Sequence, residues 1–148
     1  MSTTFREATP ADEAAVIELL TAQLSDHSIS PPRATLAAGV ARLVSTAELG
    51  RILVAERDGA VVGVAVISWV FTLEHGGRAA WLDELFVLPA HREGGIGAGL
   101  LRAVRERAKA GGAVAMDLEV EGGHERVESL YERDGFVRHD RRRWFRRL

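Results

Sequence analysis

A buried strand that leads through a glycine-rich turn into a helix constrains the fold of this 148-residue chain more than any other segment. Residues 82–88 are apolar around a short acidic break, as expected of a strand buried on both faces. Pro89 ends the strand, because proline cannot donate to a sheet ladder. Beyond Gly97 the apolar side chains recur at helical spacing, until Gly111 and Gly112 indicate the end of a helix. The segment therefore predicts a loop that runs from a buried strand directly into a helix.

The turn, Arg92–Ala98, combines the unpaired amide groups of a helix N-terminus with the positive end of the helix dipole. Its glycines let the backbone approach a ligand, so the turn suits a phosphate or pyrophosphate; a flexible connection without a ligand is the alternative. Two nucleotide-binding motifs do not fit. Leu100 stands where a dinucleotide fingerprint needs its last glycine, and no Lys-Ser or Lys-Thr pair follows Gly97 as a P-loop requires.

The remaining pattern predicts a layered fold. Thr9 resembles a helix N-cap, with Pro10 at the first helical position and Asp12 three residues after the cap, and Asp58–Gly59 is typical of a hairpin turn. We expect helices beyond Thr9 and over 33–44, beyond Gly97 and over 124–133, and strands over 3–7, 51–56, 60–73, 78–88, 114–120, 136–139 and 143–147. This order predicts an α/β fold in one domain spanning residues 1–148, with a mixed, mostly antiparallel central sheet flanked by helices.

Composition excludes several classes of site. The absence of cysteine excludes disulfides, thiol nucleophiles and cysteine metal ligands. A net charge of −2 gives no general attraction to nucleic acid or anionic membranes. Without an apolar signal core or a stretch of membrane-spanning length, we expect a cytoplasmic protein. We also expect no metal, because the histidines show no metal-ligand spacing and no cluster with carboxylates; they stand at positions 27, 75, 91, 124 and 139.

Three segments together resemble one family. Residues 86–97, FVLPAHREGGIG, resemble the acetyl-CoA pyrophosphate loop of the GNAT superfamily of N-acetyltransferases. Residues 5–9 with Asp12 resemble its opening strand and first helix, and residues 130–136, LYERDGF, resemble its "LYE-x-x-GF" segment. The resemblance implies an acetyl-CoA-dependent enzyme that moves an acetyl group to a primary amine by direct attack in a ternary complex. The alternative from another class is a non-catalytic acyl-CoA-binding or regulatory module on the same fold.

The resemblance also implies a binding site for acetyl-CoA as co-substrate. Backbone groups of Leu85, Phe86 and Val87 would pair with the pantetheine arm. The pyrophosphate would be held by the amides of Arg92, Glu93, Gly94, Gly95, Ile96, Gly97 and Ala98. His124 stands where many relatives have an asparagine that contacts the pantetheine, and histidine can supply a comparable hydrogen bond. A surface position at the start of a helix is the other interpretation of His124.

Tyr131 is the only tyrosine in the chain and our candidate general acid. Its intrinsic pKa of about 10 lies above the value of about 8.5 for a thiol, so at neutral pH its hydroxyl can protonate a departing sulfur. The alternative is a ring packed in the core with an exposed hydroxyl. Gly135 and Phe136 follow at the spacing of the family, which favours the catalytic interpretation.

Asp83 and Glu84 interrupt the apolar central strand, where an unpaired buried carboxylate is costly. Adjacent strand residues point to opposite faces, so only one should face an acceptor site unless a bulge brings both there. In relatives with "LED-L-Y-V" at this place the acidic pair helps to deprotonate the amine. The order here is reversed; we favour Glu84 as base over Asp83, and a salt bridge to an arginine remains an alternative. With Asp117 and Glu119, these acids favour a cationic amine, from a small molecule or a peptide.

The C-terminal run 138–147 is basic with interleaved aromatic residues. Such a run can contact nucleic acid, but it more often forms a charged edge strand that resists aggregation, so we expect no nucleic-acid or membrane partner. Trp144 and Phe145 would point to opposite faces of this strand. One would then pack inward while the other covers a subunit interface in a homodimer.

Overall fold

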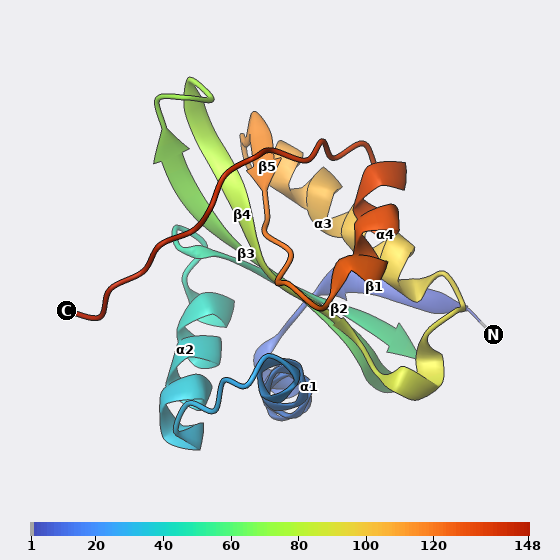
Figure 1. The fold of residues 1–148 in the computed structure, drawn as a ribbon. Coiled ribbons are helices and arrows are strands. Elements are labelled where there is room, and N and C mark those ends of the chain that lie inside the picture. The colour runs from blue at the N-terminus through green and yellow to red at the C-terminus, as the bar shows by residue number, and fades with distance from the viewer. Residues whose placement is uncertain (1) are drawn as a thin grey trace.

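The computed structural model of the chain describes residues 2–148, which form a five-stranded sheet between two layers of helices (Figure 1). The strands are β1 (Thr3–Glu7), β2 (Gly50–Arg57), β3 (Ala60–Thr72), β4 (Gly77–Val87) and β5 (Ala115–Asp117), and they lie in the sheet in chain order. The first four are antiparallel neighbours, whereas β5 runs parallel to β4. The prediction of a mixed, mostly antiparallel sheet is confirmed.

Two helices cover each face of the sheet. Helices α1 (Glu13–Asp26) and α2 (Arg33–Ser45) lie on one face, and α3 (Ile96–Ala110) and α4 (Glu128–Arg133) lie on the other (Figure 1). Short 3-10 turns occupy η1 (Pro10–Asp12), η2 (Pro89–His91) and η3 (Glu125–Val127). None of the helices within residues 2–148 has the length and hydropathy needed to cross a bilayer.

Strand alternation divides the core between the two faces. In β3, Ala65 and Ile67 pack with Leu100 of α3, whereas Val64 and Val66 pack with Val16 of α1. All six are buried, as expected when both faces of a central strand are covered by helices. The central strands of the sheet therefore carry side chains into both layers.

Local signals in the sequence correctly predicted several turns. Thr9 and Asp12 form a capping box around Pro10 at the start of η1. Asp58 and Gly59 both adopt positive φ, 53° and 77°, as a two-residue hairpin turn between antiparallel strands requires. Neighbouring residues alone specify these turns, so the turns can be predicted from the sequence.

The C-terminal part differs from the prediction. The strand expected over 114–120 shortens to three residues, the helix expected over 124–133 begins as η3, and no strand follows β5 in the chain described to residue 148. With β5 so short, little edge remains for a ladder, and side chains hold the tail instead: Arg141 pairs with Glu74 and Arg143 with Glu119, each at 2.6 Å.

The aromatic pair of the tail also differs from expectation. Trp144 and Phe145 are 91% and 81% exposed, so neither packs inward. In Figure 1 the tail leaves α4 and runs across the sheet as an irregular segment. Without a ladder there are no alternating faces, and the expectation that one of the two rings would be buried is wrong.

Candidate active site

A β-bulge in β4 shapes the centre of the site. Val66 of β3 pairs with Glu84, but the next residue, Ile67, pairs with Leu82, which leaves Asp83 without a partner in β3. Ser68 is the next residue of β3 after Ile67, and its hydroxyl donates to the carboxylate of Asp83. The extra residue breaks the strict alternation of β4.

Because of the bulge, the two neighbouring carboxylates project from the same side of the sheet. Glu84 is paired with Val66, whose side chain packs in the α1/α2 layer. Asp83 accepts from Ser68. Ile67 packs toward α3, so the next residue, Ser68, projects to the opposite face, into the α1/α2 layer. The sequence analysis expected both acids on one side only if the strand had a bulge, and the structure has that bulge.

The electrostatic setting of these two carboxylates raises the pKa of both. Burial raises the pKa of Glu84, and the charge of Asp83 raises it further, with partial offset from the nearby Gln23 and His27 side chains. Burial also raises the pKa of Asp83, against the lowering effect of its hydrogen bond from Ser68. A salt bridge to an arginine was the alternative for these acids. Among the described residues neither carboxylate forms one, and the nearby Arg143 pairs with Glu119 instead.

Strands β4 and β5 part just before this bulge. Their parallel pairing ends at Trp81 and Asp117, while β4 continues to Val87. The amide of Leu88 donates to the carbonyl of Val62 in β3. Because the direction of backbone groups alternates along a strand, the backbone groups of Phe86 also point toward β3. The backbone groups of Leu85 and Val87 therefore point into the opening between β4 and β5.

Side chains hold these two carbonyl groups in the opening. Gln23 Nε2 of α1 donates to the carbonyl of Leu85 at 3.4 Å, and Arg92 Nε donates to that of Val87 at 2.9 Å. The Arg92 guanidinium also lies over the Phe86 ring, 5.4 Å from its centroid. Arg92 thus braces the end of β4 with its side chain instead of extending toward solvent.

The glycine turn leads from this opening into α3. Gly95 precedes the helix with φ of 77°, and the amide of Gly99 makes the first helical bond, to the carbonyl of Gly95. Among residues 2–148 no side chain caps this N-terminus. The amides that precede Gly99 in the first turn can therefore receive an anion, and this arrangement fits a pyrophosphate.

The glycines of this turn have different structural reasons. A Cβ at Gly99 would stand 2.4 Å from the Phe5 ring, so Gly99 lets α3 pack closely against β1. A Cβ at Gly97 would meet its nearest neighbours at an ordinary 3.9 Å. At Gly94 the nearest atom would be Nη1 of Arg57, at 3.7 Å, so a guanidinium from the end of β2 reaches the turn. The sequence patterns had not indicated Arg57.

Tyr131 lies in α4 with its ring packed beside the opening. Its ring meets that of Phe136 edge-on, with centroids 5.8 Å apart, and the Phe136 amide donates to the Tyr131 carbonyl. Gly135, with φ of 101°, closes this Schellman-type end of α4. Burial raises the pKa of the Tyr131 hydroxyl, and the charge of Glu84 raises it further, so the hydroxyl stays protonated at neutral pH.

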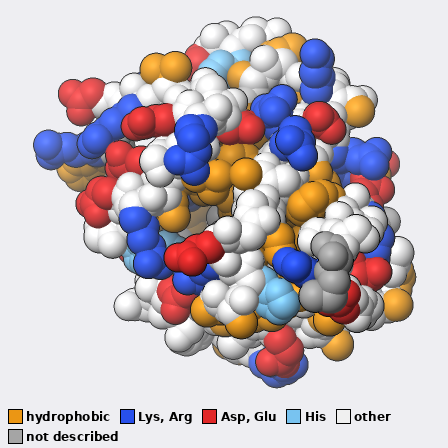
Figure 2. Space-filling view, turned by 90° about the vertical axis from the view of Figure 1, so that its right-hand side faces the viewer, with side chains coloured by type: hydrophobic (Ala, Val, Ile, Leu, Met, Phe, Trp, Pro, Cys, Tyr) orange, Lys and Arg blue, Asp and Glu red, His pale blue; other side chains and the backbone are white. Residues whose placement is uncertain are grey.

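A cavity of about 270 Å³ lies between α1, α2 and the sheet, with Glu84 in its wall. Its lining is almost entirely aliphatic and includes Leu20, Leu24, Leu36, Val40, Leu43 and Val66. The face that carries α4 is hollowed along its middle, with hydrophobic side chains inside the hollow and basic and acidic side chains interspersed around it (Figure 2). The described residues therefore combine a glycine turn whose amides have no side-chain cap, two backbone carbonyls at the edge of β4, two carboxylates and an apolar cavity.

Comparison with known proteins identifies the family. The model of the acetyltransferase (GNAT) family matches residues 14–136. The chain belongs to the GNAT family. It is 34% identical over 85 residues to the "Uncharacterized N-acetyltransferase YhfO" of Bacillus subtilis (strain 168), a match that covers 57% of each chain. It is 35% identical over 87 residues to the "IAA acetyltransferase" of Azospirillum brasilense, covering 59% of this chain and 54% of that one. The chain thus spans little more than half the length of these curated relatives.

A solved structure shares the GNAT fold over the whole chain. The aminoglycoside N-acetyltransferase AAC(6')-Iy, solved in complex with CoA, aligns with a TM-score of 0.86 and 19% sequence identity, covering 99% of this chain and 95% of that one. At this identity the likeness shows the fold alone.

The GNAT fold brings together most of the predicted site residues, but not all in the expected way. Glu84, Tyr131 and the turn 92–98 surround the opening. Asp117 instead accepts from His75 at 2.8 Å, and Glu119 pairs with Arg143. Half of the acids that favoured a cationic amine are therefore engaged elsewhere.

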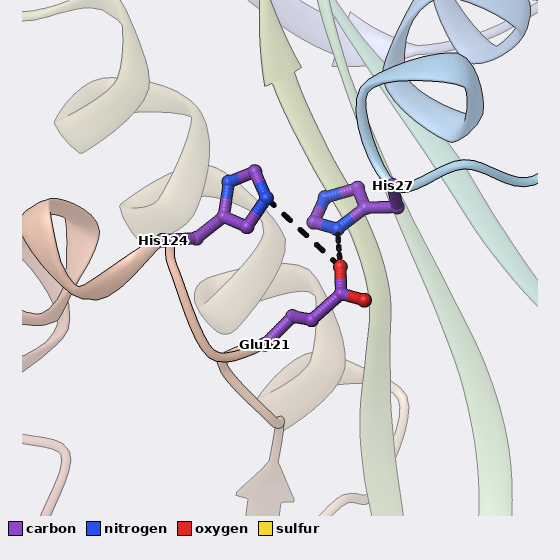
Figure 3. Close-up of side chains that lie close together, drawn as sticks. All are labelled: His27, Glu121 and His124. Atoms are coloured by element: carbon purple, nitrogen blue, oxygen red, sulfur yellow. Dashed lines mark hydrogen bonds and ion pairs between the residues drawn. The ribbon is translucent and has the colours of Figure 1, made fainter.

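The expectation that the histidines form no cluster with carboxylates is wrong. His27, at the end of α1, contacts Glu121, and the ring of His124 lies beside that of His27 with centroids 4.4 Å apart (Figure 3). Glu121 and His124 belong to the loop between β5 and α4. His27 and Glu121 are 94 residues apart, so no local pattern could have revealed the contact.

Proposed function

We propose that the chain is an acetyl-CoA-dependent N-acetyltransferase that moves an acetyl group to a primary amine by direct attack in a ternary complex. The observation that carries this proposal is the opening of β4 from β5 after Trp81, just before the bulge at Asp83. It presents the carbonyls of Leu85 and Val87 along one edge, ends at the glycine turn of α3, and has Glu84 at its inner end. An extended pantetheine arm with its pyrophosphate fits this order of groups.

Bound acetyl-CoA would supply an activated thioester carbonyl for attack by the amine. Glu84 would take a proton from the acceptor ammonium, directly or through one water. Its raised pKa makes it a stronger base than an ordinary glutamate. The Tyr131 hydroxyl would give its proton to the sulfur as the carbon–sulfur bond breaks, and it would regain a proton as the attacking nitrogen loses its second one to become the amide. Asp83 is the alternative base, since it projects to the same side. The residues of the turn, with Arg57, would hold the pyrophosphate.

The apolar cavity narrows the acceptor class in this proposal. A lining of aliphatic side chains with one carboxylate, Glu84, is suited to an amine with one cationic end and a hydrophobic body. A polyamine or an aminoglycoside carries several charges, and burying them against Leu20, Leu36 and Val40 would cost desolvation energy without compensation. We therefore expect small arylalkyl or branched alkyl monoamines to be the best acceptors.

The decisive experiment is an acetyl-CoA turnover screen over arylalkyl monoamines, alkyl monoamines, spermidine, an aminoglycoside and a peptide N-terminus. We expect the monoamines to have the highest kcat/KM. Tyr131→Phe should keep CoA affinity but lower kcat about a hundredfold, since it removes only the hydroxyl. With acetyl thioesters of better leaving groups, the difference between wild type and the variant should narrow. A constant difference along that series would leave Tyr131 as a packing residue.

A non-catalytic acyl-CoA-binding module is distinguished by separating binding from turnover. CoA should raise the Tm of the wild type, because a ligand that binds the folded state stabilises it by mass action. Gly97→Glu should remove this shift by placing a carboxylate among the amides of the turn, and its Cβ fits without a clash. Gly95 is a poorer choice because a side chain at φ of 77° is strained. A CoA-induced shift without turnover on any amine would favour the module, and a normal shift in Gly97→Glu would contradict the phosphate-binding turn.

A further inference from the structure

Three potential metal ligands converge above the sheet from two distant parts of the chain. His27 comes from the end of α1, and Glu121 and His124 come from the loop between β5 and α4 (Figure 3). One ligand atom from each side chain lies within 4.8 Å of the other two. Within residues 2–148 this is the one group of three or more such side chains at these distances.

A backbone turn holds Glu121 and His124 in place. The amide of His124 donates to the carbonyl of Glu121 at 3.0 Å, with Gly123 at φ of 94° between them. The carboxylate of Glu125 accepts from the amide of Gly123 at 3.0 and 3.1 Å, which fixes the same turn. The side chains of Glu121 and His124 therefore project together toward His27, as Figure 3 shows.

The donor set and its spacing suit a transition-metal ion. In a tetrahedral zinc site with bonds of about 2.0–2.2 Å, neighbouring ligand atoms lie about 3.4 Å apart. Here His124 Nε2 lies 4.0 Å from Glu121 Oε2, and His27 Nδ1 already contacts that oxygen. Rotamer changes would be enough to admit an ion, because the side chains of His27, Glu121 and His124 are 23%, 54% and 34% exposed.

We propose that His27, Glu121 and His124 form a binding site for one divalent transition-metal ion, with Zn²⁺ the best fit. Two imidazoles and one carboxylate make a nitrogen- and oxygen-donor set that zinc prefers over Mg²⁺ or Ca²⁺, which favour all-oxygen sites. The partial exposure of the cluster leaves a fourth position for water. The bound ion joins the end of α1 to the β5–α4 loop across the mouth of the opening between β4 and β5. This inference stands independently of the proposed transferase activity.

The test uses the full chain without a polyhistidine tag. Calorimetric titration with Zn²⁺ should give one ion per chain, and Co²⁺ should give the visible absorption of a four-coordinate site. His27→Gln and His124→Gln should each weaken Zn²⁺ binding by at least about tenfold. Zn²⁺ should raise the Tm of the wild type but not of these variants.

His75→Gln is the matched control. His75 also contacts a carboxylate, Asp117, at 2.8 Å, but that pair lacks a third ligand among the described residues, so its loss should leave Zn²⁺ binding unchanged. The proposal is overturned if the wild type binds no Zn²⁺, or if His27→Gln and His124→Gln bind as tightly as His75→Gln. Circular dichroism of the metal-free variants checks that each is folded, and Glu121→Gln, which keeps the side-chain shape, repeats the test if one histidine variant unfolds.

Discussion

One buried carboxylate, Asp12, and one less buried acidic pair, Asp83 and Glu84, have opposite electrostatic settings in this molecule. Asp12, at the junction of β1 and α1, accepts from both guanidinium nitrogens of Arg6, at 2.7 and 3.0 Å, and from the amide and hydroxyl of Thr9. These donors hold the pKa of Asp12 well below its usual range. Asp83 and Glu84, at the bulge, lie where burial outweighs their hydrogen bonds, so both pKa values are raised.

The difference separates a structural carboxylate from reactive ones. Arg6 and Thr9 satisfy Asp12 completely, and Arg6 also pairs with Glu56 at 2.6 Å, so the cluster ties β1 and β2 to η1. A base must instead gain and lose a proton near the working pH, which requires that its charge be incompletely compensated. At the bulge, Glu84 is partly buried and no arginine compensates its charge.

The largest expected effect comes from Glu84→Gln. If Glu84 is the base, kcat/KM should fall by about a hundredfold or more and the acidic limb of the pH profile should move or disappear. Stability should not fall. Since the folded pKa is raised, ionisation of Glu84 costs stability as pH rises through that value, and at pH 7 the amide avoids this cost. Thermal unfolding at pH 7 should therefore show an equal or higher Tm.

Glu119→Gln is the control for that experiment, because Glu119 is a nearby acid that already pairs with Arg143. Its kcat/KM should remain near that of the wild type. An unchanged profile in Glu84→Gln, together with a loss in Asp83→Asn, would transfer the role of base to Asp83.

Asp12→Asn should give the reverse result, with a loss of stability and no loss of kcat. Removing the charge leaves Arg6 with only Glu56, and we expect unfolding free energy to fall by about 2 kcal/mol at pH 7. Because the folded pKa of Asp12 is lowered, its contribution is present above the unfolded pKa and disappears as pH falls through the folded value. Urea unfolding from pH 7 down to about pH 3 should show the difference from wild type shrinking. An equal loss in the exposed Asp26→Asn would mean that charge in general, not this cluster, sets stability.

The same contrast explains what the sequence predicted. The Arg6–Asp12 region obeys local rules: Thr9, Pro10 and Asp12 are close in the chain, and the capping box was predicted from them. The strand, turn and helix around Gly95 were likewise predicted from neighbouring residues. In each case the interactions that specify the structure lie within a few positions.

The site depends on longer-range choices. Asp83 and Glu84 share a face only because of a bulge in the pairing of β4 with β3. The residues of β4 alone do not determine this pairing. The tail was predicted to form a pair of strands from its basic and aromatic residues. A strand also needs a partner edge, and β5 has only three paired residues. His27 and Glu121 meet only because α1 and the β5–α4 loop cover the same end of the sheet.

Ser68→Ala should have the smallest effect, yet its direction distinguishes the two candidate bases. The Ser68 hydroxyl lowers the pKa of Asp83, so its loss should raise that pKa and leave Asp83 protonated more often. If Glu84 is the base, less negative charge beside it should lower its pKa, and the acidic limb of kcat/KM should move slightly to lower pH. If Asp83 is the base, the limb should move to higher pH. We expect the former, with kcat/KM at its optimum within about threefold of wild type and stability within about 1 kcal/mol, because one partly exposed hydrogen bond is lost. Parallel pH profiles of wild type and Ser68→Ala, measured with the best monoamine, would show the sign, and a shift to higher pH would contradict the assignment of Glu84.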